Sequence, residues 1–526
     1  MILKIKVYGG KTLKSLCEKI YLELDMPNEN DTLGDKDRII HALENKYENI
    51  TMSYNIVRKL YPICRENNFK ITVTILKRQY DWVITNVEGE DTSSYNYGLA
   101  VDLGSTTIIM QLVDLNNGQV IAQESTFNKQ IKYGEDILSR IFYTMQYEDG
   151  LDEIQKSTID SFKELLNKLE WKNNIEIKNC SIMTVSGNTT MTHFLLGINP
   201  WTIFQSPFTP VFNECGFIKG EEIGIPIDGY VYCFPSVANY FGGDLISGLL
   251  YSQIYKKEKL CALIDIGTNG ELVIGNKEFL IACAGAAGPA LEGGISKYGM
   301  RASDGAIDSV KIINNKITYT TINNKKARGI CGSGIVDLIA QLFLNKWIDF
   351  SGTLIQENSN SIIKVDDEYA VEYATKEESF NGKSLIFTQS DINQFLQTKA
   401  AANTMVAYLL EEIGLDINDL DYFYTAGAFG THLNVKSAVT IGMYPDLPKE
   451  KIICPGNSSL KGAYTLLTNR YLLSDVEEIK NKIEYLQLSN ASDFVEKMRA
   501  ASFIPHTNLD LYPSVKKELI KREILK

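Results

Sequence analysis

The sequence predicts an α/β protein with two lobes of similar topology, each a mixed sheet with helices packed against it, and a small N-terminal α+β region. The first observation is a duplication. A strand, a D-x-G-S/T turn, a second strand and a hairpin to a third strand occur around Asp102 and again around Asp265. The two copies lie about one domain length apart, which favours an internal repeat. The second observation is size and composition: 526 residues, of which 44% are hydrophobic and 22% charged, suffice to bury several cores.

The N-terminal region, residues 1–94, is predicted to be one small α+β unit that joins onto the first lobe. It is rich in Asn and Lys, and its patterns predict two strands and two helices: strands 2–7 and 70–76, helices 35–43 and 55–67. The polar connector 88–94 places a boundary near residue 95.

The first lobe is predicted over residues 95–256. Its apolar strand 98–103 runs into a turn at Gly104, and strands 108–114 and 119–125 then form a hairpin around Asn116-Asn-Gly118. Asn-Gly favours such hairpins because both residues tolerate positive φ. Apolar residues at helical spacing predict a long helix after the hairpin, with these residues on its buried face: Leu151, Ile154, Ile159, Phe162, Leu165, Leu166 and Leu169.

The second lobe is predicted over residues 257–470 and repeats this order of elements. Its strand 260–266 ends in Gly267-Thr-Asn-Gly270, and strands 271–274 and 278–283 follow. A C-terminal segment, residues 471–526, is predicted to pack on the second lobe, with 483–488 as an added strand of that lobe.

The repeated turn has the chemistry of a phosphate site. The glycine lets the backbone approach a ligand, and the hydroxyl and N–H groups that follow bind anions. Asp102 and Asp265 are candidate ligands of Mg²⁺ through its waters, and candidate catalytic carboxylates that orient or deprotonate an attacking water or hydroxyl. One such turn is common at protein surfaces, so the prediction depends on there being two. The candidate phosphate-binding residues are Gly104, Ser105, Thr106 and Thr107 in the first copy, and Gly267, Thr268 and Asn269 in the second.

A third glycine-containing turn ends the apolar strand that begins at Tyr422. Its small residues, Gly427, Ala428 and Gly430, would let a flat ring lie on the backbone; the alternative is a tight strand-to-helix turn. A helix start at 455–463, with Ser458 or Ser459 as its cap, follows in the sequence.

Two phosphate turns followed by a glycine turn resemble the ASKHA superfamily, which contains actin, sugar kinases and heat-shock chaperone ATPases. That resemblance implies two actin-like, ribonuclease-H-like lobes that close on Mg-ATP. Phe241-Gly-Gly-Asp244 is similar to the first segment that connects the lobes. The resemblance implies that Asp244 helps to position the attacking water; a helix N-cap is the alternative role for this residue.

Further motifs, spread over most of the chain, resemble one branch of that superfamily, the ATP-dependent reductive activators of corrinoid proteins. Each motif has a local alternative as an ordinary loop or amphipathic helix, and the resemblance comes from their occurrence in order. The motifs are Tyr97–Thr107, Tyr133–Ile141, Ser186–Met191 with Leu196–Ile198, Pro207–Pro210, Gly288–Gly294 with Gly299–Ala302 and Gly305–Ile307, Gly329–Gly334, Ala426–Gly430, Phe503–His506 and Tyr512-Pro513.

The resemblance implies an ATPase that returns an inactive Co(II) corrinoid to Co(I), and a corrinoid protein or its methyltransferase as partner. Well-known members begin with a 2Fe–2S ferredoxin domain that carries a C-x₄-C-x₂-C motif. Here the nine cysteines are scattered without any such spacing, so we expect the ferredoxin domain to be missing and no iron–sulfur cluster to be present. Electrons would then come from a separate carrier such as ferredoxin or flavodoxin, or the chain would only remodel the corrinoid site. An iron–sulfur cluster whose cysteine ligands converge in space from distant positions, or come from two subunits, stays open as an alternative.

Net charge and the search for targeting segments restrict which partners and which cellular location we expect. A formal net charge of −12 disfavours nucleic acid as the main partner. No targeting or membrane-spanning stretch is found, so we expect a cytoplasmic protein; a homodimer is left open. A small-molecule kinase on the same fold and a non-redox, ATP-driven partner-binding switch are the alternative functions. The sequence does not identify the corrinoid partner, the methyl donor and acceptor, or the electron source.

Overall fold

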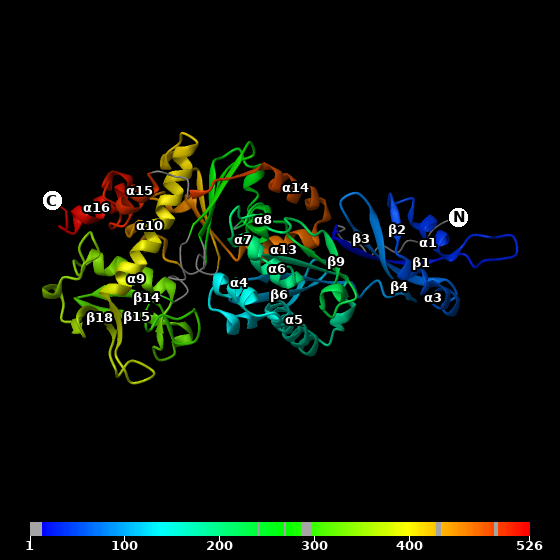
Figure 1. Ribbon diagram of the computed structural model, residues 1–526, viewed down its shortest axis with the longest axis horizontal. Helices are drawn as coiled ribbons and strands as arrows, with labels where there is room; N and C mark the ends of the chain where they lie inside the picture. Colours follow the sequence, from blue (N-terminus) through cyan, green and yellow to red (C-terminus); the bar gives the residue numbers. More distant parts are fainter. Residues whose placement is uncertain are drawn as a thin grey trace. The chain divides into compact units, whose positions relative to one another are not determined.

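The computed structural model describes residues 13–239, 241–267, 270–285, 294, 296–427, 433–488 and 493–525 (Figure 1). The chain folds into two compact units. The first unit consists of Met1–Tyr251 and Ser458–Lys482, and the second consists of Ser252–Asn457 and Ile483–Lys526.

A four-stranded sheet with helices against it forms the N-terminal part of the first unit, as predicted for an α+β region. Its strand order is β1-β3-β4-β2. The predicted strand 2–7 lies outside the described residues. The elements are β1 (Cys17–Glu23), α1 (Asp35–Leu43), β2 (Ile50–Met52), α2 (Tyr54–Val57), α3 (Leu60–Glu66), β3 (Lys70–Lys77) and β4 (Trp82–Gly89).

The single helix predicted over 55–67 is wrong, because the structure has two short helices there, α2 and α3. Pro62 explains the break. Proline has no N–H for the carbonyl four residues earlier, and its ring clashes with that carbonyl, so proline is tolerated only in the first turn of a helix. The chain therefore ends α2 at Val57 and starts α3 at Leu60, which places Pro62 in a first turn.

A six-stranded mixed sheet, in the order β7-β6-β5-β8-β10-β9, is the centre of the first unit. The predicted hairpins are confirmed, since β5–β6 and β6–β7 pair antiparallel, while β8 and β10 continue the sheet in parallel. The strands are β5 (Tyr97–Leu103), β6 (Thr107–Asp114), β7 (Val120–Phe127), β8 (Ile182–Gly187), β9 (Phe217–Lys219) and β10 (Tyr230–Cys233). The helices are α4 (Ile137–Gln146), α5 (Gly150–Asn173), α6 (Thr189–Leu196), α7 (Trp201–Phe204), α8 (Gly243–Ser252), α13 (Ser458–Thr468) and α14 (Leu473–Lys482).

The second unit repeats this topology, which confirms the predicted duplication and the α/β fold class. Its sheet has the order β21-β20-β11-β12-β13-β22. The strands β11, β12 and β13 form an antiparallel meander, and β20 and β21 extend it in parallel from β11, as β8 and β10 do from β5. The predicted added strand is β22, which pairs with β13. The strands are β11 (Cys261–Ile266), β12 (Gly270–Gly275), β13 (Leu280–Gly285), β20 (Tyr422–Ala426), β21 (Ile452–Gly456) and β22 (Ile483–Tyr485).

Two small three-stranded sheets and a set of helices complete the second unit around one large apolar core. The strands are β14 (Ala306–Ile313), β15 (Lys316–Thr321), β16 (Gly329–Ile330), β17 (Ile362–Val365), β18 (Glu368–Ala374) and β19 (Leu385–Thr388). The helices are α9 (Gly332–Leu344), α10 (Gln389–Glu412), α12 (Val435–Thr440), α15 (Phe494–Ala501) and α16 (Pro513–Lys521).

A buried lysine on α10 anchors the C-terminal segment of the second unit. The Lys399 ammonium is fully buried and donates to the backbone carbonyls of Ala501, Phe503 (2.5 Å) and Pro505 (2.6 Å). Three carbonyl oxygens match the three N–H donors of an ammonium. The segment Phe503–His506, singled out in the sequence as a motif, is therefore tied to α10 through its backbone.

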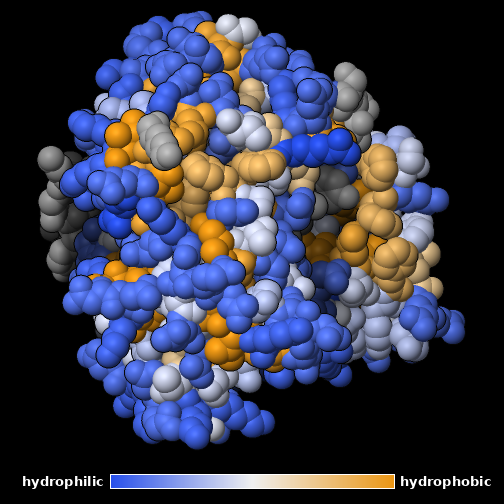
Figure 2. Space-filling view, turned by 90° about the vertical axis from the view of Figure 1, so that its left-hand side faces the viewer, coloured by the Kyte–Doolittle hydropathy of each residue, from blue (hydrophilic) through white to orange (hydrophobic). Residues whose placement is uncertain are grey.

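The surface drawn in Figure 2 is mainly hydrophilic, with apolar residues in smaller separate groups. Among the described residues, no helix combines the length and the hydropathy that a membrane span requires.

The buried His193 on α6 makes the stability of the first unit depend on pH. Its Nδ1 lies 2.7 Å from the carbonyl oxygen of Thr189, and its ring stacks on Phe212 with centroids 4.2 Å apart. Within the described part of the chain, Nε2 has no hydrogen-bond partner. Burial lowers the pKa of His193 from 6.5 to about 4.

We expect folding stability to fall by about 2 kcal/mol between about pH 7 and about pH 5 through His193 alone. The unfolded chain takes up a proton below its pKa of 6.5, whereas the folded chain does so only near 4, so acid favours the unfolded state in that window. Urea unfolding at both pH values should show this loss in the parent, and a smaller loss in His193→Phe. The matched control is His41→Phe on the exposed face of α1, which should keep the parental loss; equal losses in all three proteins would contradict the assignment.

Candidate functional site

The first predicted phosphate turn lies at the carboxyl end of β5. Asp102 is half-buried near the end of this strand, directly beside Ser186 of the parallel neighbour β8. The Gly104 N–H donates to the Thr107 carbonyl (3.1 Å), which closes the turn. A Cβ at Gly104 would lie 2.6 Å from that carbonyl oxygen, so this tight turn requires glycine.

Two residues that the sequence analysis did not assign donate hydrogen bonds to the backbone carbonyls of the first turn. Asn128 donates from Nδ2 to the Gly104 carbonyl (3.0 Å) and from its backbone N–H to the Thr106 carbonyl (2.8 Å). Arg140, fully buried on α4, donates from Nη1 to the Ser105 carbonyl (2.6 Å). Its guanidinium places a positive charge under the turn, which favours an anionic ligand. The only sequence signal for Arg140 was its place in the motif Tyr133–Ile141.

Asp102 is also contacted by a residue very distant in the sequence. Ser459, near the start of α13, donates from Oγ to Asp102 Oδ1 (2.7 Å). Ser458 or Ser459 was predicted as a helix cap, but the Ser459 hydroxyl bonds to the side chain of this strand residue. The Ser459 Oγ also lies 2.7 Å from Ser186 Oγ. The chain that leaves β21 thus returns to the first unit and closes one side of the Asp102 turn.

Asp244 lies in the first turn of α8, whereas an N-cap, the alternative role considered for it, would precede the helix. Its carboxylate is half-buried, and its Oδ1 accepts from the Leu245 N–H at 3.0 Å. The helix starts at Gly243, so Asp244 stands inside the helix rather than at the position before it. Its role in positioning water stays a prediction.

The second predicted turn brings Asp265 and Gly427 together in the second unit. Asp265 is half-buried in β11, and Ala426 is its neighbour on the parallel strand β20. Gly427 has a φ of +87°, and a Cβ there would lie 2.5 Å from Asp265 Oδ1. Any larger residue would displace the carboxylate. Gly267 follows β11, whereas Thr268, Asn269, Ala428 and Gly430 lie outside the described residues, as does most of the motif Gly288–Gly294.

The groups around Asp102 fit a phosphate with a hydrated Mg²⁺. A glycine turn that a Cβ would fill, hydroxyl and N–H donors, a buried guanidinium below and a carboxylate at the edge form a donor set for this ligand. Among the residues that the structure describes, no group of three or more His, Cys, Asp and Glu side chains could hold a metal ion directly. That Asp102 and Asp265 hold Mg²⁺ through its waters stays a prediction.

The cysteine thiols are mostly buried and protonated. All nine are free, seven of them buried. Burial raises the pKa of Cys64, Cys215 and Cys261 to about 11. Burial raises the pKa of Cys17 and Cys233 further still. Ligation of a metal by one of these thiols would require loss of its proton.

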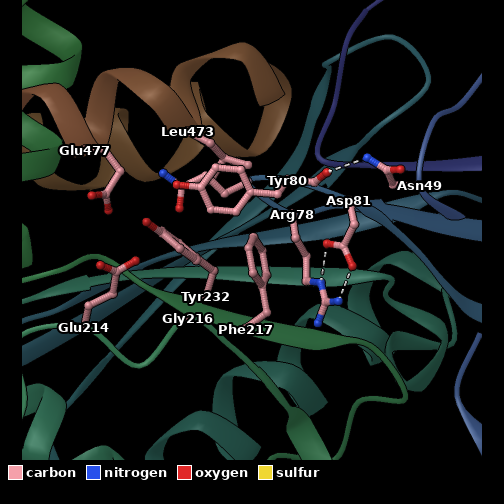
Figure 3. A pocket seen from close by; sticks show the side chains of 11 residues that line it. Asn49, Arg78, Tyr80, Asp81, Glu214, Gly216, Phe217, Tyr232, Leu473 and Glu477 are labelled. Carbon is pink, nitrogen blue, oxygen red and sulfur yellow. Dashed lines mark hydrogen bonds and ion pairs between the residues drawn. The ribbon is translucent and has the colours of Figure 1, made fainter. Parts of the chain in front are cut away.

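A separate cavity of about 600 Å³ lies in the first unit, between the β3–β4 loop, the strands β9 and β10, and α14 (Figure 3). None of the predicted site residues is among the side chains that line it. Its charged groups pair with neighbours: Arg78 with Asp81, and Lys480 with both Glu214 (2.6 Å) and Glu477 (3.0 Å). We assign no ligand to this cavity.

Three family models match consecutive parts of the chain. They describe the linker region of RACo over residues 10–94, the middle region of RACo over residues 97–257, and the C-terminal domain of RACo, the ASKHA domain, over residues 259–516.

Curated and solved proteins give a similar result. The corrinoid activation enzyme RamQ from Eubacterium limosum is 32% identical over 410 residues, which cover 76% of this chain and 69% of the relative. The Co(II) methylated amine-specific corrinoid protein reductase from Methanosarcina barkeri is 25% identical over 444 residues, with 76% and 75% covered. The solved structure of a reductive activator for corrinoid, iron-sulfur protein has 37% identity and a TM-score of 0.89, with 97% of this chain and 82% of that chain covered.

Proposed function

Since this chain belongs to the RACo family of ASKHA proteins, we propose that it is an ATP-dependent activator that returns the cobalt of a corrinoid protein from Co(II) to Co(I). Two of its relatives, a corrinoid activation enzyme and a reductase of a Co(II) corrinoid protein, support this reaction. The partner is proposed to be a corrinoid protein or its methyltransferase. A cytoplasmic location and a homodimer belong to the same proposal.

The observation that carries the ATPase part is the construction of the Asp102 turn. Asn128 and Arg140 fix the carbonyls of Gly104 and Ser105, and the hydroxyls and N–H groups of residues 104–107 would hold phosphate oxygens. Asp102 and Asp265 are proposed to accept hydrogen bonds from the water shell of Mg²⁺, which neutralises phosphate charge, and to orient the attacking water.

Three further assignments complete the proposed site. Asp244 helps to position the attacking water. Gly267, Thr268 and Asn269 bind phosphate in the second turn. Gly427, Ala428 and Gly430 accommodate the flat adenine ring. The close approach of Gly427 to Asp265 supports a shared role for these two residues in the second unit.

The reaction couples two balanced steps. ATP is hydrolysed to ADP and phosphate, and one electron passes from a reduced carrier to Co(II), which becomes Co(I). The carrier is proposed to be a separate protein of the ferredoxin or flavodoxin class, because the nine cysteines of this chain lack the C-x₄-C-x₂-C spacing of a 2Fe–2S ferredoxin domain. The uphill electron transfer is driven by the difference in affinity of the complex for the ATP and ADP states. The as-isolated protein should show no iron–sulfur absorbance in the visible range.

We expect ATP turnover to rise at least about tenfold when a Co(II) corrinoid protein is added, because the partner selects the hydrolytic state of the enzyme. The measurement is phosphate release with and without the partner. The methylated form of the same corrinoid protein is the control and should stimulate turnover little. No stimulation by any corrinoid protein, together with phosphorylation of a small metabolite, would favour a kinase instead.

A further inference from the structure

Three buried serine hydroxyls connect Asp102 to the first turn of α8. Ser459 Oγ lies 2.7 Å from Asp102 Oδ1 and 2.7 Å from Ser186 Oγ, and Ser186 Oγ lies 2.6 Å from Ser247 Oγ. At the far end, the Ser247 Oγ lies 2.9 Å from the carbonyl oxygen of Asp244. Ser186 and Ser247 are fully buried and Ser459 is 6% exposed. These hydroxyls lie entirely within the first unit and run from the Asp102 carboxylate to the backbone carbonyl of Asp244.

The hydrogens of the three serine hydroxyls can be arranged in two ways, which differ in which hydroxyl donates to which. Each hydroxyl has one hydrogen to donate and can accept from its neighbours. In the first direction Ser459 donates to Asp102, Ser186 to Ser459, and Ser247 to Ser186. In the reverse direction Ser459 donates to Ser186, Ser186 to Ser247 or to the Gly243 carbonyl (3.2 Å), and Ser247 to the Asp244 carbonyl. Every donor has an acceptor in both states, so the switch needs only rotation of three hydroxyls.

We propose that Ser459, Ser186 and Ser247 form a reversible hydroxyl relay that transmits the state of the Asp102 carboxylate to the first turn of α8, where Asp244 stands. The inference rests on the proposed ATPase function. When Asp102 Oδ1 accepts another donor in the nucleotide-bound protein, Ser459 turns to Ser186 and the relay reverses. Ser186, at the centre, is then a positioning residue for Asp244 that contacts neither ATP nor water itself.

The second unit shows that the fold does not require this serine. There the residue beside the strand aspartate is Ala426, which is next to Asp265 on β20 as Ser186 is next to Asp102 on β8. The same topology is thus built with and without a hydroxyl at this position. A hydroxyl at position 186 therefore has a role beyond packing of the sheet. The proposed relay, which lies within the first unit, gives it such a role.

Hydrogen–deuterium exchange of the α8 peptide 243–252, with and without Mg-ATP, tests the relay. In the parent protein we expect ATP to change the exchange of this peptide. In Ser186→Ala the change should be lost, and turnover should fall about five- to tenfold, the size that one hydrogen bond supports, with the Kd for ATP within about twofold of the parent. The matched control is Thr184→Val on the same strand, which removes the hydroxyl bonded to the Ala463 carbonyl of α13 (3.0 Å) but leaves the relay complete.

The possible results of this experiment distinguish three cases: an active relay, a purely structural role of β8, and a failure of the proposed ATPase function. Thr184→Val should keep the parental exchange response; the same loss in both variants would show that β8 merely packs against α13. A full response in Ser186→Ala, or none in the ATP-bound parent, would refute the relay. Failure of the parent to bind ATP would instead refute the proposed function. Ser459→Ala, which removes the first donor, provides a second test if Ser186→Ala unfolds, and it should lose the response too.

Discussion

Asp265→Ala is expected to lower ATP turnover by about 10²- to 10⁴-fold, the range that a positioned catalytic carboxylate contributes. The expectation comes from its place at the carboxyl end of β11, half-buried beside the glycine turn at Gly427. Loss of the carboxylate would remove the proposed acceptor for the water shell of Mg²⁺ and for the attacking water. Phosphate release at saturating Mg-ATP measures the effect, and ATP affinity measured by calorimetry shows whether binding is lost with turnover.

The matched control for this experiment is Asp421→Ala. Asp421 is also half-buried, and it lies at the opposite end of the same strand pair, where its Oδ2 accepts from the Leu260 N–H at 3.2 Å. Its removal should cost stability but leave turnover per folded molecule near the parental value. Asp102→Ala should behave like Asp265→Ala. Unchanged ATP binding and turnover in Asp265→Ala would show that the repeated turns were wrongly assigned as the nucleotide site.

The duplication was accessible from the sequence because its signals are local. Apolar strands of five to eight residues, an Asn-Gly hairpin and a glycine two residues after each aspartate are all encoded within short segments, and the structure reproduces both meanders. The break between α2 and α3 was also encoded locally, by Pro62, so that error was one of interpretation rather than of missing information.

The supports of the Asp102 turn could not be predicted in this way. Arg140 and Asn128 reach the turn through packing of α4 and of the segment after β7, and no spacing rule relates them to Gly104. Ser186 lies beside Asp102 only because β8 pairs with β5 in one particular register. Sequence order placed Ser459 after the second-lobe strand β21, yet its helix belongs to the first unit. Such contacts depend on which strands and helices become neighbours, which a single sequence does not state.

Gly462→Ala is expected to destabilise the first unit by about 3 kcal/mol and to abolish ATP turnover with it. A Cβ at this position of α13 would lie 2.0 Å from the Ser247 carbonyl oxygen and 2.4 Å from its carbon, both backbone atoms of α8. No side-chain rotation relieves such a contact, so α13 and α8 must move apart. That movement would also break the Ser459–Asp102 hydrogen bond and the contact of Ser186 with Ser247.

Urea unfolding measures the loss of stability, and phosphate release under folding conditions measures turnover of the molecules that remain folded. Lys461→Ala is the control, because it places the same residue in the same turn of α13 on its exposed face, and it should leave both quantities near the parental values. If Gly462→Ala showed the same stability against urea and the same ATP turnover as the parent, the close approach of α13 and α8 would be wrong. The geometry described around Asp102 would then be wrong as well. If Gly462→Ala stayed folded but lost turnover, the contact would matter for catalysis more than for stability. The reason would be that the relay and the Asp102 turn both depend on the position of α13.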